Sequence, residues 1–304
     1  MAAGLRSPAG IEASPDGEIF YTDNQGEWCG AGKLAILERG TFHGHPHGVE
    51  SCKLPESQVP PIGELPKKIL MPKLKEVSPH FTMPAVFFPY DKMGKSPAGF
   101  AWDTTKGAFG PFAGQIFVGD QHHSSVMRVF LEKVNGQWQG ACFPFRNGLD
   151  SGVIRVLFGA DNSLIAGMTN RGWGSKGNRS YGLQRLVWNG KVPFEIHEMR
   201  ATSKGFRLIF TRPVEMVSAA MPGSYQLESY TYEHHQGYGS KEMDKSKLRV
   251  KRILVHSDLR SVDLEVEGLR DGYVHELIAR GVRDNEKRWP LLHAQAYYTL
   301  LSRP

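Results

Sequence analysis

A short run of acidic and histidine residues, Asp120-Gln121-His122-His123, directly follows an apolar stretch. A carboxylate beside an imidazole can fix the tautomer of the ring and prepare it to act as a general base. The sequence therefore offers Asp120 with His122 or His123 as candidate catalytic residues. Adjacent histidines in a loop are also often simply solvated, and that alternative stays open.

A second polar stretch, TDNQGEWCGAGKLAILERGTFHGHP, combines glycines with acidic, amide and histidine side chains. Asp23 comes directly after a strand-like apolar run, and His43 and His45 are two residues apart, on one face of an extended segment. Two imidazoles placed in this way could chelate a metal ion. The alternative, which we favour, is that these histidines are structural or contact a substrate.

A third polar stretch, TNRGWGSKG, contains Asn170, Arg171 and Trp173. Hydrogen-bonding side chains beside a flat aromatic face suit a sugar ring or an aromatic cofactor. The alternative is a loop that only packs beneath a neighbouring domain. Further along, SYTYEHHQGYGS carries alternating tyrosines, which predict a packed strand, with carbohydrate binding as the alternative.

The polar stretches follow strands that recur along the chain. Three units share a polar turn, three or four strand-type apolar residues and a polar cluster: SPDGEIFYTDN, FAGQIFVGDQ and GADNSLIAGMTN. Phe117 and Ile165 are 48 residues apart, and Phe20 lies about twice that distance before Phe117. Periods of roughly 40–50 residues built from strands predict β-propeller blades, whose polar strand ends would meet at one mouth. Three ordinary hairpins of a sandwich are the alternative.

The composition of the chain shifts near Asn189-Gly190. After that point six or seven segments alternate apolar and polar residues with period two, which predicts strands that bury one face. Helical periodicity is scarce, and the Pro- and Lys-rich residues 52–75 predict an extended, solvated excursion. We therefore expect an all-β chain, with a partial propeller of about three to four blades at 1–190 and an immunoglobulin-like or fibronectin-like β-sandwich at 191–304.

Composition and motif spacing exclude several functional classes. The net charge of +6 is spread along the 304 residues, so we expect no nucleic-acid binding. No run of about eighteen apolar residues predicts a membrane span, and the start of the chain lacks the pattern of a signal peptide. Cys29, Cys52 and Cys142 have neither zinc-site spacing nor a C-x-x-C-H haem attachment motif.

The first 190 or so residues resemble the soluble quinoprotein glucose/sorbosone dehydrogenases, which are six-bladed propellers. Three consecutive motifs carry the resemblance: a G-x-R-N-P turn (Gly4, Arg6, Pro8), a T-E-x-G-P segment (Thr22, Asp23, Gly26) and an L-N-x-I-x-x-G-x-N-Y-G-W-P run (Leu34, Ile36, Gly40, Phe42, Gly44, Pro46). The segment SPAGFAWDTTKGAFGPFAGQIFVGDQHHSSVMRV is similar to a later part of the same family. The runs NRGWGSKG, YGLQRLVW and PFEIHEMRAT resemble large secreted planctomycete-type proteins with a C-terminal sandwich.

This resemblance implies oxidation of an aldose, sorbosone or another polyol-type molecule through pyrroloquinoline quinone (PQQ), with calcium. It implies calcium ligation by the backbone carbonyls of Gln25 and Gly26. It further implies a secreted or periplasmic location, and partners in upstream propeller blades or in a haem or other electron-acceptor module. The residues that would contact the cofactor are Arg6, Asn24, Gln121, Asn170, Arg171 and Trp173.

The chain also departs from the family pattern. The catalytic histidine of the family lies upstream of Met1, Ser7 stands where the family has Asn, and Arg155 is displaced by one residue from a cofactor-clamping position. A shift of one residue along a strand turns a side chain to the opposite face. We therefore expect a dehydrogenase-like fragment that is incomplete as an enzyme by itself. The alternatives are a non-catalytic carbohydrate- or partner-binding module, and a hydrolase or lactonase with a metal at its mouth.

Overall fold

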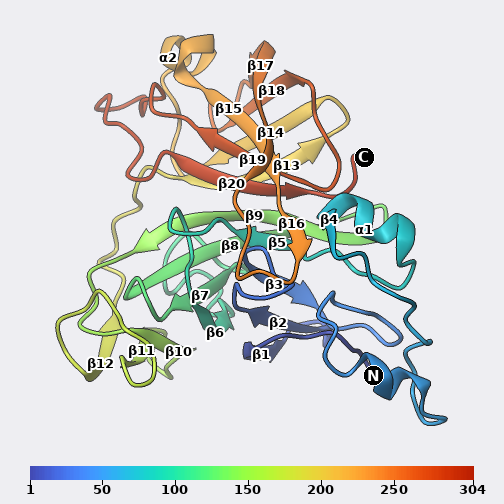
Figure 1. Ribbon diagram of the computed structural model, residues 1–304. Coiled ribbons are helices and arrows are strands. Elements are labelled where there is room, and N and C mark those ends of the chain that lie inside the picture. Colours follow the sequence, from blue (N-terminus) through green and yellow to red (C-terminus); the bar gives the residue numbers. More distant parts are fainter.

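The computed structural model describes residues 1–304 and is all-β, with strands in four sheets (Figure 1). Its first sheet is an antiparallel meander near the N-terminus, which a fourth strand extends after a long excursion. These strands, in hydrogen-bonded order, are β1 (Pro8–Ala13), β2 (Ile19–Asp23), β3 (Gly32–Ile36) and β5 (Val86–Phe88).

Two further meanders follow in the chain. The second consists of β6 (Pro97–Trp102), β7 (Ile116–Asp120), β8 (Ser125–Val134) and β9 (Gln137–Arg146). The third is a separate sheet of β10 (Val153–Phe158), β11 (Leu164–Thr169) and β12 (Tyr181–Leu186). We call these the first, second and third meanders.

The C-terminal strands form two layers that share one long strand, β17 (Met243–Val255). One layer adds β13 (Ile196–Thr202), β14 (Gly205–Phe210) and β18 (Ser261–Glu267), and the other adds β15 (Gln226–Thr231), β19 (Tyr273–Ile278) and β20 (Gln295–Leu300). Strand β20 pairs with β9, so both layers and the second meander belong to one eleven-stranded sheet. The predicted division at residue 190 lies in the irregular segment 187–195, and the immunoglobulin-like assignment stays a prediction.

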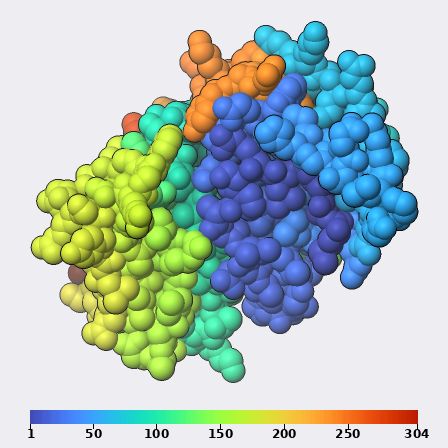
Figure 2. Space-filling view, turned by 60° about the horizontal axis from the view of Figure 1, so that its bottom comes forward, coloured from blue at the N-terminus to red at the C-terminus, as the bar shows by residue number.

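The three repeated sequence units correspond to β2, β7 and β11, the second strand of each meander. Their first strands lie side by side, with β6 between β1 and β10, and each is bulged near its start. A Cβ atom on Gly10 would lie 2.6 Å from the Ala98 carbonyl oxygen, and one on Gly99 would lie 2.8 Å from that of Ile154. Glycine therefore permits the close approach of these three backbones. In the space-filling view the N-terminal residues and the third meander flank the teal residues at the start of the second meander (Figure 2).

Three apolar cores hold the sheets together. One lies around the first meander and reaches Tyr230 and Tyr297 of the C-terminal layers, and one lies between the second and third meanders. The third core lies in the C-terminal layers and also includes Phe130 and Phe143, from β8 and β9. The meanders and the C-terminal layers are thus packed together as well as hydrogen-bonded.

The prediction that residues 52–75 form a solvated excursion is wrong for the end of that segment. Strand β4 (Lys68–Leu70) pairs with β16 (Glu233–His235), and the helix α1 (Met71–Val77) follows it. Met71 and Leu74 lie on one face of this helix and are buried in the core around the first meander. The other helical segments are η1 (Val49–Lys53), α2 (Met216–Ala220) and η2 (Pro222–Ser224), and none of the helices has the length and apolar character to cross a membrane.

Candidate functional site

The polar clusters predicted from the sequence lie at the same end of their meanders. Asp23 ends β2 opposite Pro8 of β1, and Asp120 ends β7 opposite Pro97 of β6. Asn170 directly follows β11. We call the loops at this end, residues 24–31, 89–96, 120–125 and 170–180, the rim.

Hydrogen bonds join the rim loops to one another. The Lys176 N–H donates to the His122 carbonyl oxygen (2.8 Å), and the Gly177 N–H donates to Oγ of Ser124 (2.8 Å). Nε2 of His123 lies 3.2 Å from Oδ1 of Asp91. Three loops from different parts of the chain therefore form one continuous layer.

Asp23 and Asp120 are fully buried, and each uses its carboxylate to hold a turn. Asp120 accepts hydrogen bonds from the N–H groups of Lys95 (2.7 Å), Ser96 (2.8 Å) and His123 (2.7 Å). The carboxylate that contacts the His123 imidazole is that of Asp91. The geometry thus gives Asp120 a positioning role for the backbone, and the predicted pairing of its side chain with an imidazole is not present.

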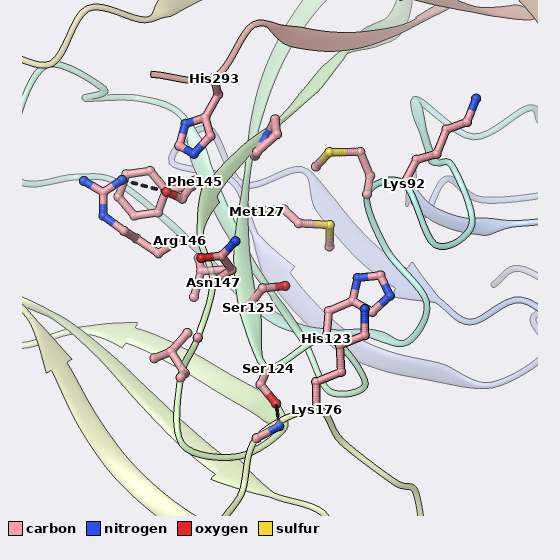
Figure 3. Close-up of a pocket in the computed structure, with 16 residues that line it drawn as sticks. Lys92, His123, Ser124, Ser125, Met127, Phe145, Arg146, Asn147, Lys176 and His293 are labelled. Atoms are coloured by element: carbon pink, nitrogen blue, oxygen red, sulfur yellow. Dashed lines mark hydrogen bonds between the residues drawn. The ribbon is translucent and has the colours of Figure 1, made fainter. Parts of the chain in front are cut away.

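A cavity of about 430 Å³ opens beside the rim, where β8 begins and β9 ends (Figure 3). None of its sixteen lining residues carries a carboxylate. The polar lining groups come from four rim or strand-end segments and from the C-terminal layers: Lys92, His123, Ser124, Ser125, Arg146, Asn147, Lys176 and His293. Met93, Met127, Pro144 and Phe145 supply apolar surface.

Of the cationic side chains around this cavity, one is paired with carboxylates and two are not. The Lys92 ammonium lies 2.7 Å from Glu242 and 2.6 Å from Glu276. Arg146 and Lys176 form no ion pair with a carboxylate, and both side chains are exposed. The Arg146 guanidinium instead donates to the Phe145 carbonyl oxygen (2.6 Å) and lies over the Phe145 ring. The cavity therefore carries an excess of positive charge.

His293 reaches the cavity from the loop before β20. Its Nδ1 lies 2.8 Å from the buried Glu195 carboxylate, which also accepts a hydrogen bond from the His293 N–H. The two contacts fix the orientation of the ring and direct its other nitrogen away from Glu195. His293 can thus offer a hydrogen bond to a molecule in the cavity.

Asp91, His122 and His123 form a second constellation at the rim. One side-chain ligand atom from each lies within 4.8 Å of the other two. Nδ1 of His122 also lies 3.0 Å from the Gly174 carbonyl oxygen, in the loop after β11. His123 belongs to both this cluster and the lining of the cavity.

The residues expected to contact PQQ are spread around the rim, and the best candidate clamp is already paired. The Arg6 guanidinium donates to Glu27 (2.8 Å) and lies over the ring of Tyr238. The Gln121 N–H donates a hydrogen bond to the Ser96 carbonyl oxygen, and the Gln121 side chain packs beside Gly152. Asn170, Arg171 and Trp173 are exposed and lie outside the cavity lining.

The surroundings of the groups expected to bind calcium also differ from those that a calcium site needs. The Gly26 carbonyl oxygen accepts hydrogen bonds from the N–H groups of Cys29 (3.1 Å) and Gly239 (3.0 Å). The buried Lys33 ammonium lies 3.7 Å from Asp23, next to this loop. Asn24 Oδ1 and Gln25 Oε1 are buried without a hydrogen-bond partner, but the Lys33 ammonium beside the adjacent Asp23 opposes a second cation. The residues present therefore fit neither quinone nor calcium, and we derive no step through either.

His43 and His45 each have one ring nitrogen in contact with a neighbouring group of the protein. His43 is buried beside Thr41, and Nδ1 of His45 accepts a hydrogen bond from the His47 N–H. Burial, together with the nearby Lys33 charge, lowers the pKa of His43 to about 3. These contacts favour a structural role for both histidines.

Sequence reasoning missed Asp91 and the basic lining of the cavity. One readable signal was a repeat, because R-S-P-A-G at 6–10 recurs as K-S-P-A-G at 95–99. Both copies enter the first strand of a meander, and both are held by the aspartate at the end of the next strand. Asp91 lies just before the second copy, but no local pattern connects it to His122 or His123.

No protein-family model matches this chain, and no curated protein matches it. Among solved structures, the chain is similar to a Thermus thermophilus protein that is provisionally described as an oxidoreductase (glucose dehydrogenase). The two share 20% sequence identity with a TM-score of 0.40, over 61% of this chain and 46% of that protein. The chain thus matches less than half of that protein's length. A TM-score at this level establishes neither the fold nor an activity.

Proposed function

We propose that this chain is a binding module of propeller type, in which the three meanders act as blades and the rim cavity takes a small, anionic, hydroxylated molecule. A sugar acid or a sugar phosphate has this chemistry. The observation that carries the proposal is the cavity lining, which has cationic side chains in Arg146 and Lys176 and no carboxylate.

The size and polarity of the cavity support such a ligand. A volume of about 430 Å³ lies within the range that small-molecule sites occupy. Arg146 and Lys176 would pair with the carboxylate or phosphate, because charge-assisted hydrogen bonds are the strongest that side chains offer to such groups. Ser125, Asn147 and His293 would bond the hydroxyl groups, and the apolar lining would contact the carbon skeleton.

Calorimetric titration with gluconate, glucose 6-phosphate and glucose tests the proposal. We expect one or both anions to bind and neutral glucose to bind at least ten-fold more weakly. Arg146→Ala and Lys176→Ala should each weaken binding of the anion at least ten-fold, because each removes a charged hydrogen bond of roughly 1.5–3 kcal/mol. Lys204→Ala, which removes an exposed cation outside the cavity, is the matched control. Equal affinity for glucose and both anions, or binding that neither cavity substitution weakens, would contradict the proposal.

A sugar dehydrogenase of the glucose/sorbosone type is the second candidate, and the convergence of polar loops at one end of three meanders favours it. Because the residues of this chain fit neither PQQ nor calcium, this candidate depends on the upstream blades and the electron acceptor that the resemblance implies. It is tested by dye reduction with an aldose, PQQ and calcium. Reduction that requires the quinone would favour a dehydrogenase over a module that only binds.

A further inference from the structure

We propose that Asp91, His122 and His123 form a binding site for a divalent first-row transition metal of the zinc type. One ligand atom from each of the three side chains lies within 4.8 Å of the others. Two imidazole nitrogens and one carboxylate oxygen are a donor set that suits zinc and its neighbours in the first row. The proposal does not depend on the identity of the cavity ligand.

The peptide unit that joins the two histidines is held in place before any metal arrives. The His122 carbonyl oxygen accepts from the Lys176 N–H, and the His123 N–H donates to the buried Asp120 carboxylate. Nδ1 of His122 faces the Gly174 carbonyl oxygen at 3.0 Å, so this nitrogen is the donor and Nε2 keeps its lone pair. A backbone carbonyl that fixes the tautomer in this way is a common partner of metal-ligating histidines.

The three ligand atoms must come together around an ion, although His123 Nε2 and Asp91 Oδ1 already lie 3.2 Å apart. Ligand atoms around one tetrahedral zinc ion lie about 3.4 Å apart, as bond lengths of about 2.1 Å require. The Asp91 side chain is 53% exposed, so its carboxylate can move inward without disturbing a core. Three protein ligands leave at least one position open, and His123 brings the metal to the edge of the cavity.

Lys95 competes with the metal in the free protein. Its ammonium lies 3.5 Å from the same Asp91 Oδ1 atom that faces His123. A bound divalent ion would displace this ammonium from Asp91 and would be repelled by it at short range. Lys95→Gln should therefore strengthen metal binding, a gain that few unspecific surface sites would show.

Titration of the chelator-treated chain with Zn²⁺, and with Co²⁺ followed by its visible absorption, tests the site. We expect one equivalent to bind, at least ten-fold weaker binding in His122→Ala, His123→Ala and Asp91→Asn, and tighter binding in Lys95→Gln. His80→Ala, which removes an exposed histidine elsewhere, should bind as the unmodified chain does. Zn²⁺ should also raise the melting temperature of the unmodified chain and not that of Asp91→Asn.

Two results would overturn the proposal. One is the absence of a stoichiometric Zn²⁺ or Co²⁺ equivalent in the unmodified chain. The other is binding that persists unchanged in both His123→Ala and Asp91→Asn. Asp91 is exposed and its backbone has a positive φ of 58°, a conformation that Asn also tolerates, so Asp91→Asn should fold even where a histidine substitution does not.

Discussion

Asp23 and Asp120 hold equivalent positions in two meanders, each at the end of a second strand with its carboxylate bonded to two consecutive backbone N–H groups. Asp23 accepts from Arg6 (3.0 Å) and Ser7 (2.8 Å), and Asp120 accepts from Lys95 and Ser96. Both turns lead into a Pro-Ala-Gly strand start. This repeated arrangement fixes the backbone where each of these first strands begins. It thereby also positions the rim loops around that point.

Asp120→Ala should strongly destabilise the fold. The substitution leaves the N–H groups of Lys95, Ser96 and His123 without their acceptor, and each buried unsatisfied group costs about 1–3 kcal/mol. We expect the free energy of unfolding to fall by about 3 kcal/mol or more, measured by urea denaturation. Asp16→Ala, at an exposed turn, is the control and should change stability by less than about 0.5 kcal/mol. A small effect at Asp120 would mean that the turn does not depend on its carboxylate.

Gly99→Ala should also destabilise the protein, because the first strands approach too closely for a side chain. A Cβ at this position would lie 2.8 Å from the Ile154 carbonyl oxygen and 3.1 Å from Cα of Arg155, both backbone atoms. We expect a loss of roughly 1–3 kcal/mol, as for other overpacked sites. Gly63→Ala adds a methyl group in open space and serves as the control in thermal unfolding. Equal melting temperatures for the two variants would show that β6 and β10 can separate at little cost.

The all-β class and the strand repeat could be predicted because they depend on local patterns. β18 buries Val262, Leu264 and Val266 and leaves the residues between them more accessible, as its period of two indicates. The repeated units were recognisable because β2 and β7 are buried along their length and end at a polar residue. Local apolar and polar order is sufficient information for such elements.

The candidate site could be predicted only in part, because its groups meet through long-range contacts. His123 was singled out, but its partner Asp91 is 32 residues away and follows a different strand. Lys92 is neutralised by Glu242 and Glu276, which belong to the C-terminal layers. The pairing of β20 with β9 has no local signal at all. Such contacts follow from tertiary packing rather than from residue spacing.

Arg128→Met should weaken the attachment of the C-terminal layers to the second meander. The buried guanidinium lies 4.2 Å from the ring centres of Phe112 and Phe143, and it donates to the Ile196 (2.5 Å) and His197 (2.8 Å) carbonyl oxygens of β13. Methionine fills much of the volume but leaves the Ile196 carbonyl oxygen without the Arg128 donor, whereas the His197 carbonyl oxygen keeps a second donor in Nε2 of Gln115 (2.9 Å).

We expect a loss of about 1–3 kcal/mol for Arg128→Met, the cost of leaving a buried acceptor without its donor. In the Arg128→Met variant, the backbone amide hydrogens of β13 should exchange faster than those of β11, because β13 opens more readily. Arg185→Met, at an exposed position of β12, is the matched control. Unchanged exchange in β13 would contradict this role for Arg128.

Mild acid should destabilise the protein through its buried histidines. Burial lowers the folded-state pKa of both His43 and His275 to about 3, from an ordinary value of 6.5. The unfolded chain therefore binds more protons than the folded chain between these values, so stability is complete above about pH 6.5 and falls as the pH decreases toward 3. Each histidine should contribute about 1.4 kcal/mol per pH unit, or roughly 2 kcal/mol between pH 6.5 and 5.

Urea denaturation at pH 7.5 and 5.0 measures this loss of stability, and His43→Gln should reduce the loss by about the share of one histidine. Carboxylates contribute little in this window because their unfolded-state pKa values lie below it. An identical loss in His43→Gln would mean that His43 is protonated in the folded protein as readily as in the unfolded chain.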